Sequence, residues 1–255
     1  MKQLPIAQTH TVRNRMLIVA WPYRSLDIVG SLALAAATIP VVLLAGFLVK
    51  LTSRGPVFYS QIRVGLDGEQ FRIFKIRTMY DRCEAHSGVR WATRADTRIT
   101  PVGRILRKLH IDELPQMWNI VIGDMSLVGP RPERPEIGAQ LAVVIPDYPE
   151  RISVRPGLTG LAQIQWPSDT SIETVRIKLQ FDQRYIAEKS LWLDLRILAG
   201  TGLYLLGASY GQVRWLAGLP SIDGSNASEA AQHDLDADDA EAYRETSLAT
   251  PCLEK

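Results

Sequence analysis

Residues 111–132 read IDELPQMWNIVIGDMSLVGPRP. Two carboxylates, Asp112 and Glu113, stand just before Pro115, a residue that helices accept in their first turn. We therefore expect the acidic pair at a helix N-terminus, where free N–H groups and the helix dipole favour negative charge. An apolar run at helical spacing follows, and a short apolar piece then leads into Gly-Pro-Arg-Pro. The stretch places an acidic pair, a short helix and a rigid turn in direct succession.

The acidic pair has two interpretations. An N-cap aspartate with an acidic first turn is an ordinary stabilising feature, and the pattern alone is typical of it. The surroundings favour chemistry, because Arg131 lies on the proline turn and further basic residues precede the pair. These include Arg63, Lys75, Arg77, Arg104 and Arg107. Carboxylates among arginines suit a phosphate anhydride held by Mg²⁺, with one acid as nucleophile and the other as metal ligand or general base. A solvated basic face, or one attracted to an anionic membrane, is the alternative for the basic residues.

The charge of the chain is unevenly distributed. Its 255 residues carry a formal net charge of +2, but residues 221–255 hold nine acids and two bases, so the remainder is basic. A basic body of this size suits one domain that binds anionic lipid or phosphate. We expect no nucleic-acid partner, because the sequence has no RNP-like, zinc-finger or helix-turn-helix signature. Cys83 and Cys252 form no CxxC spacing, so we expect a reducing compartment and no disulfide.

Residues 28–49 contain no charged side chain. As a helix they would extend about 33 Å, enough to cross a bilayer core. One transmembrane helix is the ordinary interpretation, and a signal anchor would look the same. Pro40 favours a kinked or broken helix, because proline removes a backbone hydrogen bond. Basic residues flank both ends, so the positive-inside rule gives no orientation, as expected if both ends stay in the cytoplasm.

The middle of the chain predicts a hairpin followed by short helices. Residues 57–62 and 70–79 suit two strands, with turn residues between them. Lys75 and Arg77 share a face of the second strand, which is either a wet face or the cationic wall of a site. Residues 80–95 predict a mobile loop. We further expect helices at 101–110, 135–145 and 172–189, a turn at 155–157 and a strand at 161–166.

The last apolar segment, residues 191–206, is flanked by tryptophan and tyrosine. A core helix would fit this composition, but the aromatic residues favour a helix that lies on the membrane surface. Residues 221–255 have no apolar period and predict a disordered acidic tail.

Nine short motifs occur along the chain in a known order. They are GPVFY (55–59), QIRVG (61–65), FKIRTM (74–79), DTRIT (96–100), GR (103–104), DELPQ (112–116), GDMS (123–126), GPRP (129–132) and RPGLTG (155–160). With them the chain resembles the bacterial sugar transferase family over residues 22–205. These are the monotopic phosphoglycosyl transferases that start polysaccharide and glycan assembly. Two details differ from the family: Ile39 stands before Pro40 where serine is common, and Tyr23 replaces the lysine of a Lys-Arg pair.

The resemblance implies an α/β fold of mixed α+β type, rich in helix. It would be a single domain with an N-terminal re-entrant membrane helix and interfacial amphipathic helices. The expected divisions are an N-terminal segment (1–21), a re-entrant helix broken at Pro40 (22–50), a catalytic domain (51–220) and the acidic tail (221–255). The expected location is the bacterial inner membrane, with the catalytic domain facing the cytoplasm.

The resemblance also implies a reaction. A sugar 1-phosphate would pass from a UDP-sugar to polyprenyl (undecaprenyl) phosphate, with Mg²⁺ as cofactor, as the first membrane step of exopolysaccharide or glycan synthesis. Asp112 would be the nucleophile of a covalent intermediate, and Glu113 would join it in catalysis and metal binding. Direct one-step transfer with Asp112 as base, and an inactive membrane-anchored scaffold, are the alternatives. The presence of Asp112 and Arg131 disfavours the scaffold.

Further site residues follow from the resemblance. Phosphate binding is expected from Arg131, Arg107 and Arg63, and more weakly from Lys75 and Arg77. Nucleotide-sugar contacts are expected from Asp96, Arg98, Arg104, Arg155, Asp182 and Tyr185. The last two are otherwise ordinary residues of a helix surface. Chains of the exopolysaccharide type favour galactose or glucose, but no residue chooses between sugars, and a homodimer is left open.

Overall fold

The computed structural model describes residues 6–81, 83, 96–167 and 171–222, with backbone alone for residues 6–20. The expectations for residues 84–95 and for the tail at 223–255 lie outside them. In chain order, with η for 3-10 helices, the elements are α1 (Ile6–Thr52), β1 (Phe58–Val64), η1 (Leu66–Gly68), β2 (Gln70–Ile76), α3 (Pro101–Lys108), η2 (Ile111–Gln116), α4 (Met117–Ile122), β3 (Ser126–Val128), α5 (Pro135–Val144), η3 (Tyr148–Ser153), β4 (Gly157–Thr159), α6 (Ile172–Glu188), α7 (Leu191–Leu205) and α8 (Tyr210–Leu216). The fold is mixed and rich in helix, as predicted.

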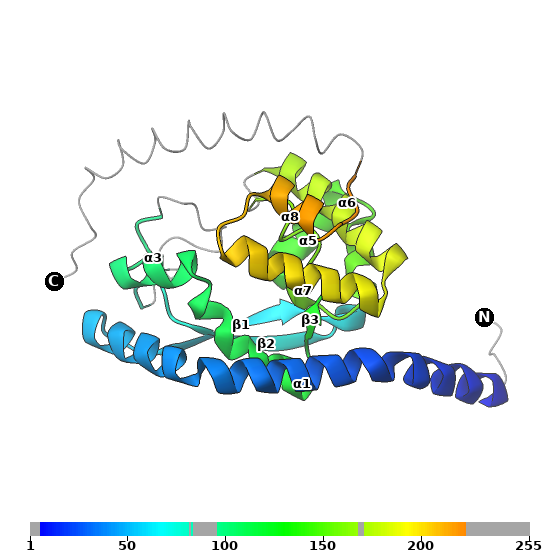
Figure 1. The fold of residues 1–255 in the computed structure, drawn as a ribbon, viewed down its shortest axis with the longest axis horizontal. Helices are drawn as coiled ribbons and strands as arrows, with labels where there is room; N and C mark the ends of the chain where they lie inside the picture. The colour runs from blue at the N-terminus through cyan, green and yellow to red at the C-terminus, as the bar shows by residue number, and fades with distance from the viewer. Residues whose placement is uncertain (1–5, 82, 84–95, 168–170, 223–255) are drawn as a thin grey trace.

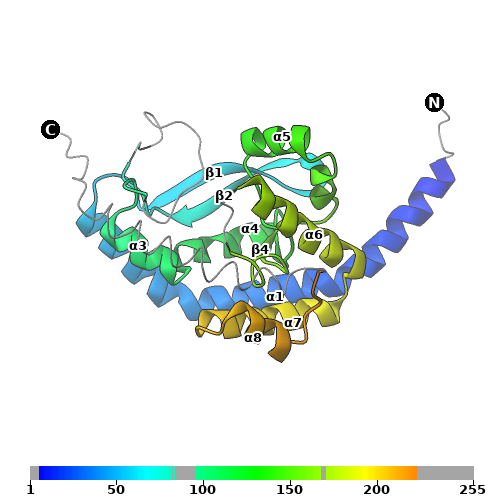
Figure 2. The ribbon, with the colours of Figure 1, turned by 90° about the horizontal axis from the view of Figure 1, so that it is seen from above.

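The first element is one long helix. α1 runs along one side of the molecule (Figure 1), and the view from above shows that it is bent along its length (Figure 2). Pro22 and Pro40 lie inside it, and the helix continues through both. The hydroxyl of Thr38 donates to the carbonyl oxygen of Leu34 at 2.7 Å. The helix is thus bent and continuous, which agrees with the kink expected from Pro40, because a proline removes one backbone bond while its neighbours persist. The break at Pro40 that the resemblance implies is not seen. The division expected at residue 21 falls inside this helix.

The predicted hairpin is confirmed, with its bounds shifted. β1 and β2 pair antiparallel, from Phe58 opposite Ile76 to Val64 opposite Gln70. The second strand ends at Ile76, so Arg77 lies just beyond it and not on its face as predicted. Leu66–Gly68 forms the connection, in which Gly68 has a φ of +85°, a conformation that glycine adopts readily.

A second, parallel pair joins two motifs that are far apart in sequence. Ser126 of β3 lies opposite Gly157 of β4, and Val128 opposite Thr159. The two segments of backbone approach so closely that a Cβ atom on Gly157 would lie 2.1 Å from the backbone nitrogen of Gly129. Both positions therefore require glycine. This contact fixes the Gly-Pro-Arg-Pro turn against the segment that begins at residue 155.

The strand predicted at residues 161–166 is wrong. This segment forms consecutive turns, in which the Gln163 N–H donates to Gly160 O at 3.1 Å and the Trp166 N–H to Ala162 O at 3.0 Å. The neighbours Leu161 and Ala162 are both buried. A strand would turn one of two successive side chains away from the core. The apolar run reflects burial on all sides of a turn and has no strand period.

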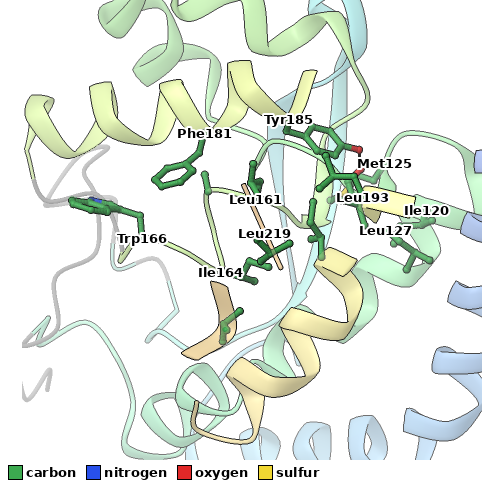
Figure 3. Close-up of a cluster of buried hydrophobic side chains, with 14 of the residues drawn as sticks. Ile120, Met125, Leu127, Leu161, Ile164, Trp166, Phe181, Tyr185, Leu193 and Leu219 are labelled. Carbon is green, nitrogen blue, oxygen red and sulfur yellow. Dashed lines mark hydrogen bonds between the residues drawn. The ribbon is translucent and has the colours of Figure 1, made fainter. Parts of the chain in front are cut away.

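The predicted helices at 101–110, 135–145 and 172–189 are confirmed as α3, α5 and α6. The main core lies where α4, β3, α6 and α7 meet. Figure 3 shows buried side chains from these elements, among them Ile120, Leu127, Phe181 and Leu193. Val175 and Leu179 of α6 are buried, whereas 45% of the surface of Ile172, its first residue, is exposed.

A separate buried cluster joins α1 to the body of the molecule. Ala45 and Val49 of α1 pack with Ile76 of β2 and Leu106 of α3, and Ile111 packs against this cluster. Elsewhere α1 is apolar and exposed over much of its length. Trp21–Thr52 is long and apolar enough to cross a membrane by length and composition, and only 11% of its most apolar window is buried.

α7 has one buried side and one exposed apolar side. Leu193 and Ile197 are buried in the core, while Trp192 is 68% exposed. Trp215 of the neighbouring α8 is 79% exposed. α7 is therefore a core helix along one side and exposes apolar side chains along the other. Its placement on a membrane surface stays a prediction.

Candidate active site

The acidic pair lies in the first turn of η2, a 3-10 helix that leads directly into α4. The sequence predicted a helix start here, and the structure confirms it. His110, between α3 and η2, has a left-handed backbone with φ of 55°. This sharp change of direction lets the acidic residues line a cavity of about 500 Å³. Asp112 and Glu113 are 6% and 9% exposed.

Glu113 is held by two cations. Lys75 Nζ of β2 lies 2.6 Å from Glu113 Oε1. The Arg131 guanidinium donates to the same oxygen, and its Nη1 lies 3.3 Å from Oε2. Burial alone would raise the pKa of Glu113, but the charges of Arg131 and Lys75 outweigh it and hold that pKa well below its usual range. Glu113 is therefore an anionic clamp that fixes two cations in the cavity wall.

Asp112 has a different environment. Among the described residues nothing donates a hydrogen bond to its carboxylate. Burial and the neighbouring Glu113 raise the pKa of Asp112, although Lys75, Arg107 and Arg131 act in the opposite direction. The sequence suggested that the helix N-terminus would dominate the ionisation of Asp112. In the structure it does not. A carboxylate without hydrogen-bond donors keeps its lone pairs available for reaction when it is ionised.

The cationic residues predicted from the sequence lie around the acidic pair, and their other contacts restrain them to different degrees. Arg107 of α3 lines the cavity, and its Nε donates to Thr78 Oγ1 at 2.8 Å. Arg63 of β1 also lines it and pairs with Glu133 at 3.1 Å. Arg77 borders the cavity, but its guanidinium donates to the carbonyl oxygens of Ser53 and Arg54 after α1. Arg77 therefore acts chiefly on the end of α1, and Lys75 is the cation of the hairpin that reaches Glu113.

The residues expected near the nucleotide separate into two groups. Arg98 and Asp182 line the cavity. Asp96 lies behind Arg98 and pairs with it at 2.6 Å. In the part of the chain that the structure describes, the cavity wall does not include Arg104, Arg155 or Tyr185.

Arg155 and Tyr185 contact other parts of the fold. Arg155 Nε donates to Gly123 O at 3.1 Å and so holds the end of α4. Tyr185 is a core residue whose hydroxyl donates to Asp194 Oδ1 at 2.9 Å. Both support the fold around the cavity without reaching it.

The sequence is similar to those of known proteins. The family model described as bacterial sugar transferase covers residues 19–207. This chain belongs to the bacterial sugar transferase family. The assignment to the phosphoglycosyl transferases made from the motifs is thereby confirmed.

Three relatives in the family illustrate its range. The chain is 46% identical over 180 residues to the UDP-glucose:undecaprenyl-phosphate glucose-1-phosphate transferase of Caulobacter vibrioides, covering 70% of this chain and 67% of that protein. It is 42% identical to the UDP-N-acetylgalactosamine-undecaprenyl-phosphate N-acetylgalactosaminephosphotransferase of Aeromonas hydrophila, over 72% of this chain and 43% of that one. It is 37% identical to the exopolysaccharide production protein PSS of Rhizobium leguminosarum, over 70% of this chain and 92% of that one. The match thus spans less than half of the Aeromonas relative.

Arg151 is a site residue that sequence reasoning missed in this sugar transferase. It lies in η3 and lines the cavity with Tyr148 and Asp182. Its guanidinium pairs with Asp182 Oδ2 at 2.9 Å. An irregular segment offers no periodicity to mark such a residue. The one available signal is that it stands four residues before the RPGLTG motif.

The metal ligands that the transferase offers suit an ion that arrives bound to the substrate. Among the described residues no group of three or more His, Cys, Asp or Glu side chains could hold a metal ion. Mg²⁺ is commonly bound by one or two carboxylates and completes its shell with water and substrate phosphates. The adjacent carboxylates of Asp112 and Glu113 provide that minimal set. The chemistry of the pair therefore fits Mg²⁺ bound to a diphosphate, not a preformed metal cage.

Proposed function

We propose that this chain transfers a sugar 1-phosphate from a UDP-sugar to undecaprenyl phosphate through a covalent intermediate on Asp112. The observation that carries the proposal is the contrast within the acidic pair. Asp112 accepts no hydrogen bond among the described residues, while Glu113 next to it binds Lys75 and Arg131. A reactive carboxylate beside fixed cations suits attack on an anionic phosphorus. The names of the relatives support the donor and acceptor classes.

The reaction has two balanced steps. In the first, a carboxylate oxygen of Asp112 attacks the phosphorus that carries the sugar, the bond to the bridging oxygen breaks, and UMP leaves. In the second, an oxygen of the polyprenyl phosphate attacks the same phosphorus, and Asp112 departs as a carboxylate. The product is a polyprenyl-diphosphate sugar. The soluble donor and the lipid acceptor therefore react in turn and need not share the cavity.

The cations of the cavity wall set the electrostatics of both steps. The Glu113 carboxylate raises the pKa of Arg131, so this side chain stays cationic. Nearly half of the Arg131 side chain is exposed in the cavity wall, where it can meet a phosphate oxygen. Asp112 and Glu113 would hold Mg²⁺, which supplies further charge neutralisation when it is bound.

The apolar surface brings this chemistry to the membrane. We propose that α1 lies within one leaflet of the bacterial inner membrane and that the body faces the cytoplasm. Apolar side chains are also exposed on other elements, namely Ile105, Leu109, Trp118, Ile122, Trp192, Leu195, Trp215 and Leu216. Ile111, the residue before Asp112, packs against the cluster that contains Ala45 and Val49 of α1. The nucleophile is thus one residue from a contact with the proposed membrane helix, at the level where a lipid phosphate would arrive.

One observation favours a second mechanism. Because burial raises the pKa of Asp112, this carboxylate is also a better base than an exposed aspartate. In that case the lipid phosphate would attack the donor directly, and Asp112 would take up a proton. The overall reaction would be the same, but no intermediate on the protein would form.

Release of UMP tests the proposed activity. The full chain in nanodiscs is given undecaprenyl phosphate, Mg²⁺ and, in separate reactions, UDP-glucose, UDP-galactose and UDP-N-acetylgalactosamine. We expect UMP and a lipid-linked sugar from at least one donor, and neither product from Asp112→Asn. Failure of the wild-type chain with every donor, under conditions in which the Caulobacter relative turns over, would support the inactive scaffold.

A further inference from the structure

The turn that carries Arg131 is held through its backbone carbonyl groups. Three successive carbonyl oxygens, those of residues 130, 131 and 132, each accept a hydrogen bond from a different segment. The donors are the Gly157 N–H at 2.9 Å, Arg151 Nη2 at 3.0 Å and Arg63 Nη1 at 3.3 Å. Pro130 and Pro132 fix their own φ angles, and Pro132 restricts Arg131 to extended conformations. The carbonyl oxygen of Arg131 itself is held by a side chain, that of Arg151.

Arg151 is in turn fixed by two neighbours. Its Nε lies 3.0 Å and its Nη2 2.9 Å from Asp182 Oδ2 of α6. Its Nη1 donates to the Tyr148 hydroxyl, and its guanidinium carbon lies 4.9 Å from the centre of the Tyr148 ring. The Arg151 and Asp182 side chains are 14% and 3% exposed. A largely buried guanidinium with this many partners is held close to one orientation.

We propose that Arg151 and Asp182 are positioning residues for Arg131. The connection runs from Asp182 through the Arg151 guanidinium to the Arg131 carbonyl, and from the Arg131 side chain to Glu113. Loss of the Asp182 charge removes the ion pair that orients Arg151. Arg151 then turns away, and the turn loses one of the three hydrogen bonds to its carbonyl groups, the one that Arg131 O accepts. This inference rests on the proposed function, in which Arg131 neutralises the phosphate.

A direct role in binding the donor is the rival, because both residues also line the cavity. The two roles differ in kinetics. A positioning role acts on the transition state through Arg131, so kcat falls while the KM for the donor stays nearly constant. A binding role raises that KM. The effect of a positioning residue also disappears once Arg131 is removed, whereas an independent contact with the donor remains.

The variants follow from this difference. Asp182→Asn keeps the shape of the side chain and removes its charge. Arg151→Lys keeps the positive charge but cannot reach Asp182 and the Arg131 carbonyl together. If Arg151 positions Arg131, this variant should be impaired. If only the positive charge matters, it should keep its activity. Arg184→Ala is the matched control on α6, because Arg184 forms an exposed ion pair with Glu188 at 2.7 Å that does not involve the turn.

The test combines kinetics with hydrogen exchange on the full chain in nanodiscs. We expect Asp182→Asn and Arg151→Lys to lower kcat by about 100-fold, since small misplacements near the reacting atoms have effects of this size. Donor KM should change less than about threefold, and Asp182→Asn should add less than about threefold in an Arg131→Ala background. Exchange should increase in the peptide spanning residues 126–134 in both variants and stay unchanged in Arg184→Ala.

Three outcomes would overturn the proposal. They are a raised donor KM at constant kcat, a full effect of Asp182→Asn on top of Arg131→Ala, or unchanged exchange at the turn. The exchange measurement needs no turnover. If the wild-type chain were inactive, the proposed function would fail, while exchange at the turn would still decide the link from Asp182 to Arg131. If Asp182→Asn does not fold, Arg151→Lys provides the same comparison.

Discussion

The carboxylate of Asp27, in α1, accepts a hydrogen bond from Ser126 Oγ of β3 at 2.8 Å. The same Oδ1 oxygen accepts the Leu127 N–H, also at 2.8 Å. Nearby, Arg24 donates to the carbonyl oxygens of Ile120 and Val121 at the end of α4. β3 leads into the proline turn and α4 follows the acidic pair. The long apolar helix is therefore built into the catalytic body as well as exposed beside it.

The first prediction concerns the stability that Asp27 contributes. Asp27→Ala should lower the free energy of unfolding by about 1–3 kcal/mol, because the buried Ser126 hydroxyl and Leu127 N–H lose their acceptor. Thermal unfolding in nanodiscs measures this. Asp147→Ala, at an exposed position, is the control and should change stability by less than about 0.5 kcal/mol. Equal unfolding temperatures for the two variants would show that the contact is not stabilising.

The second prediction concerns the membrane topology of α1. If the helix lies in one leaflet, single cysteines placed at His10 and at Ser60 should both resist a membrane-impermeant reagent added from the periplasmic side. Pro40→Ala should increase labelling at one end, because it restores a helical hydrogen bond and favours a straight, spanning helix. Labelling of only one end in the wild-type chain would establish that α1 spans the membrane.

The third prediction is a pH effect centred on Asp194. Burial raises the pKa of Asp194 to about 6, although the Tyr185 hydrogen bond and Lys189 act in the opposite direction. A raised folded-state pKa means that the folded protein binds the proton more tightly than the unfolded chain. The stabilisation is present below the unfolded pKa of about 4 and is lost as pH rises through about 6.

Asp194→Asn removes this titration. The variant should be more stable than the wild type at pH 7.5, by on the order of 1–3 kcal/mol, and equal to it near pH 4. Its neutral amide oxygen can still accept the Tyr185 hydroxyl. Unfolding temperatures measured at both pH values test this. A variant that is less stable than the wild type at pH 7.5 would show that the charged form of Asp194 is favoured in the fold.

The fourth prediction concerns the acidic tail. Its sequence has no apolar period, so we expect it to contribute nothing to turnover. The structure moves the best truncation point from Pro220 to Ile222, because Ile222 packs against the core and Gln165 Nε2 donates to Pro220 O at 3.0 Å. A chain that ends at Ile222 should keep turnover within a few-fold. A 100-fold loss, equivalent to about 2.7 kcal/mol of transition-state stabilisation, would show that the tail takes part.

Local sequence patterns predicted most of the helices and strands. They did not predict the contacts between residues far apart in the sequence. The hairpin and the helices α3, α5 and α6 follow from turn residues and apolar spacing. The segment at 161–166 failed, because turns buried on all sides have no period. The parallel pairing of β3 with β4, and the contact from Asp27 to Ser126, join residues that no local pattern relates.

The candidate site also contains residues that sequence motifs identified and residues that only the structure reveals. Motifs identified Asp112, Glu113, Lys75 and Arg131, and the structure brings them together in one cavity wall. The resemblance places Tyr185 near the nucleotide sugar, but this residue lies in the core, since its hydroxyl needs a buried partner and finds it in Asp194. Arg151 was missed because its role depends on Asp182, 31 residues away in the sequence.

The central claim is a covalent step on Asp112, and intact-mass spectrometry of the protein given donor alone tests it most directly. Without acceptor lipid, the wild-type chain with Mg²⁺ and its UDP-sugar should gain the mass of one sugar phosphate and release a matching amount of UMP. Peptide mapping should place the adduct on Asp112, and Asp112→Asn should form none. Initial rates with both substrates should give parallel reciprocal lines, as a two-step exchange requires. A chain that turns over with acceptor present, yet forms no adduct from donor alone and gives intersecting lines, would contradict the covalent mechanism and establish direct transfer.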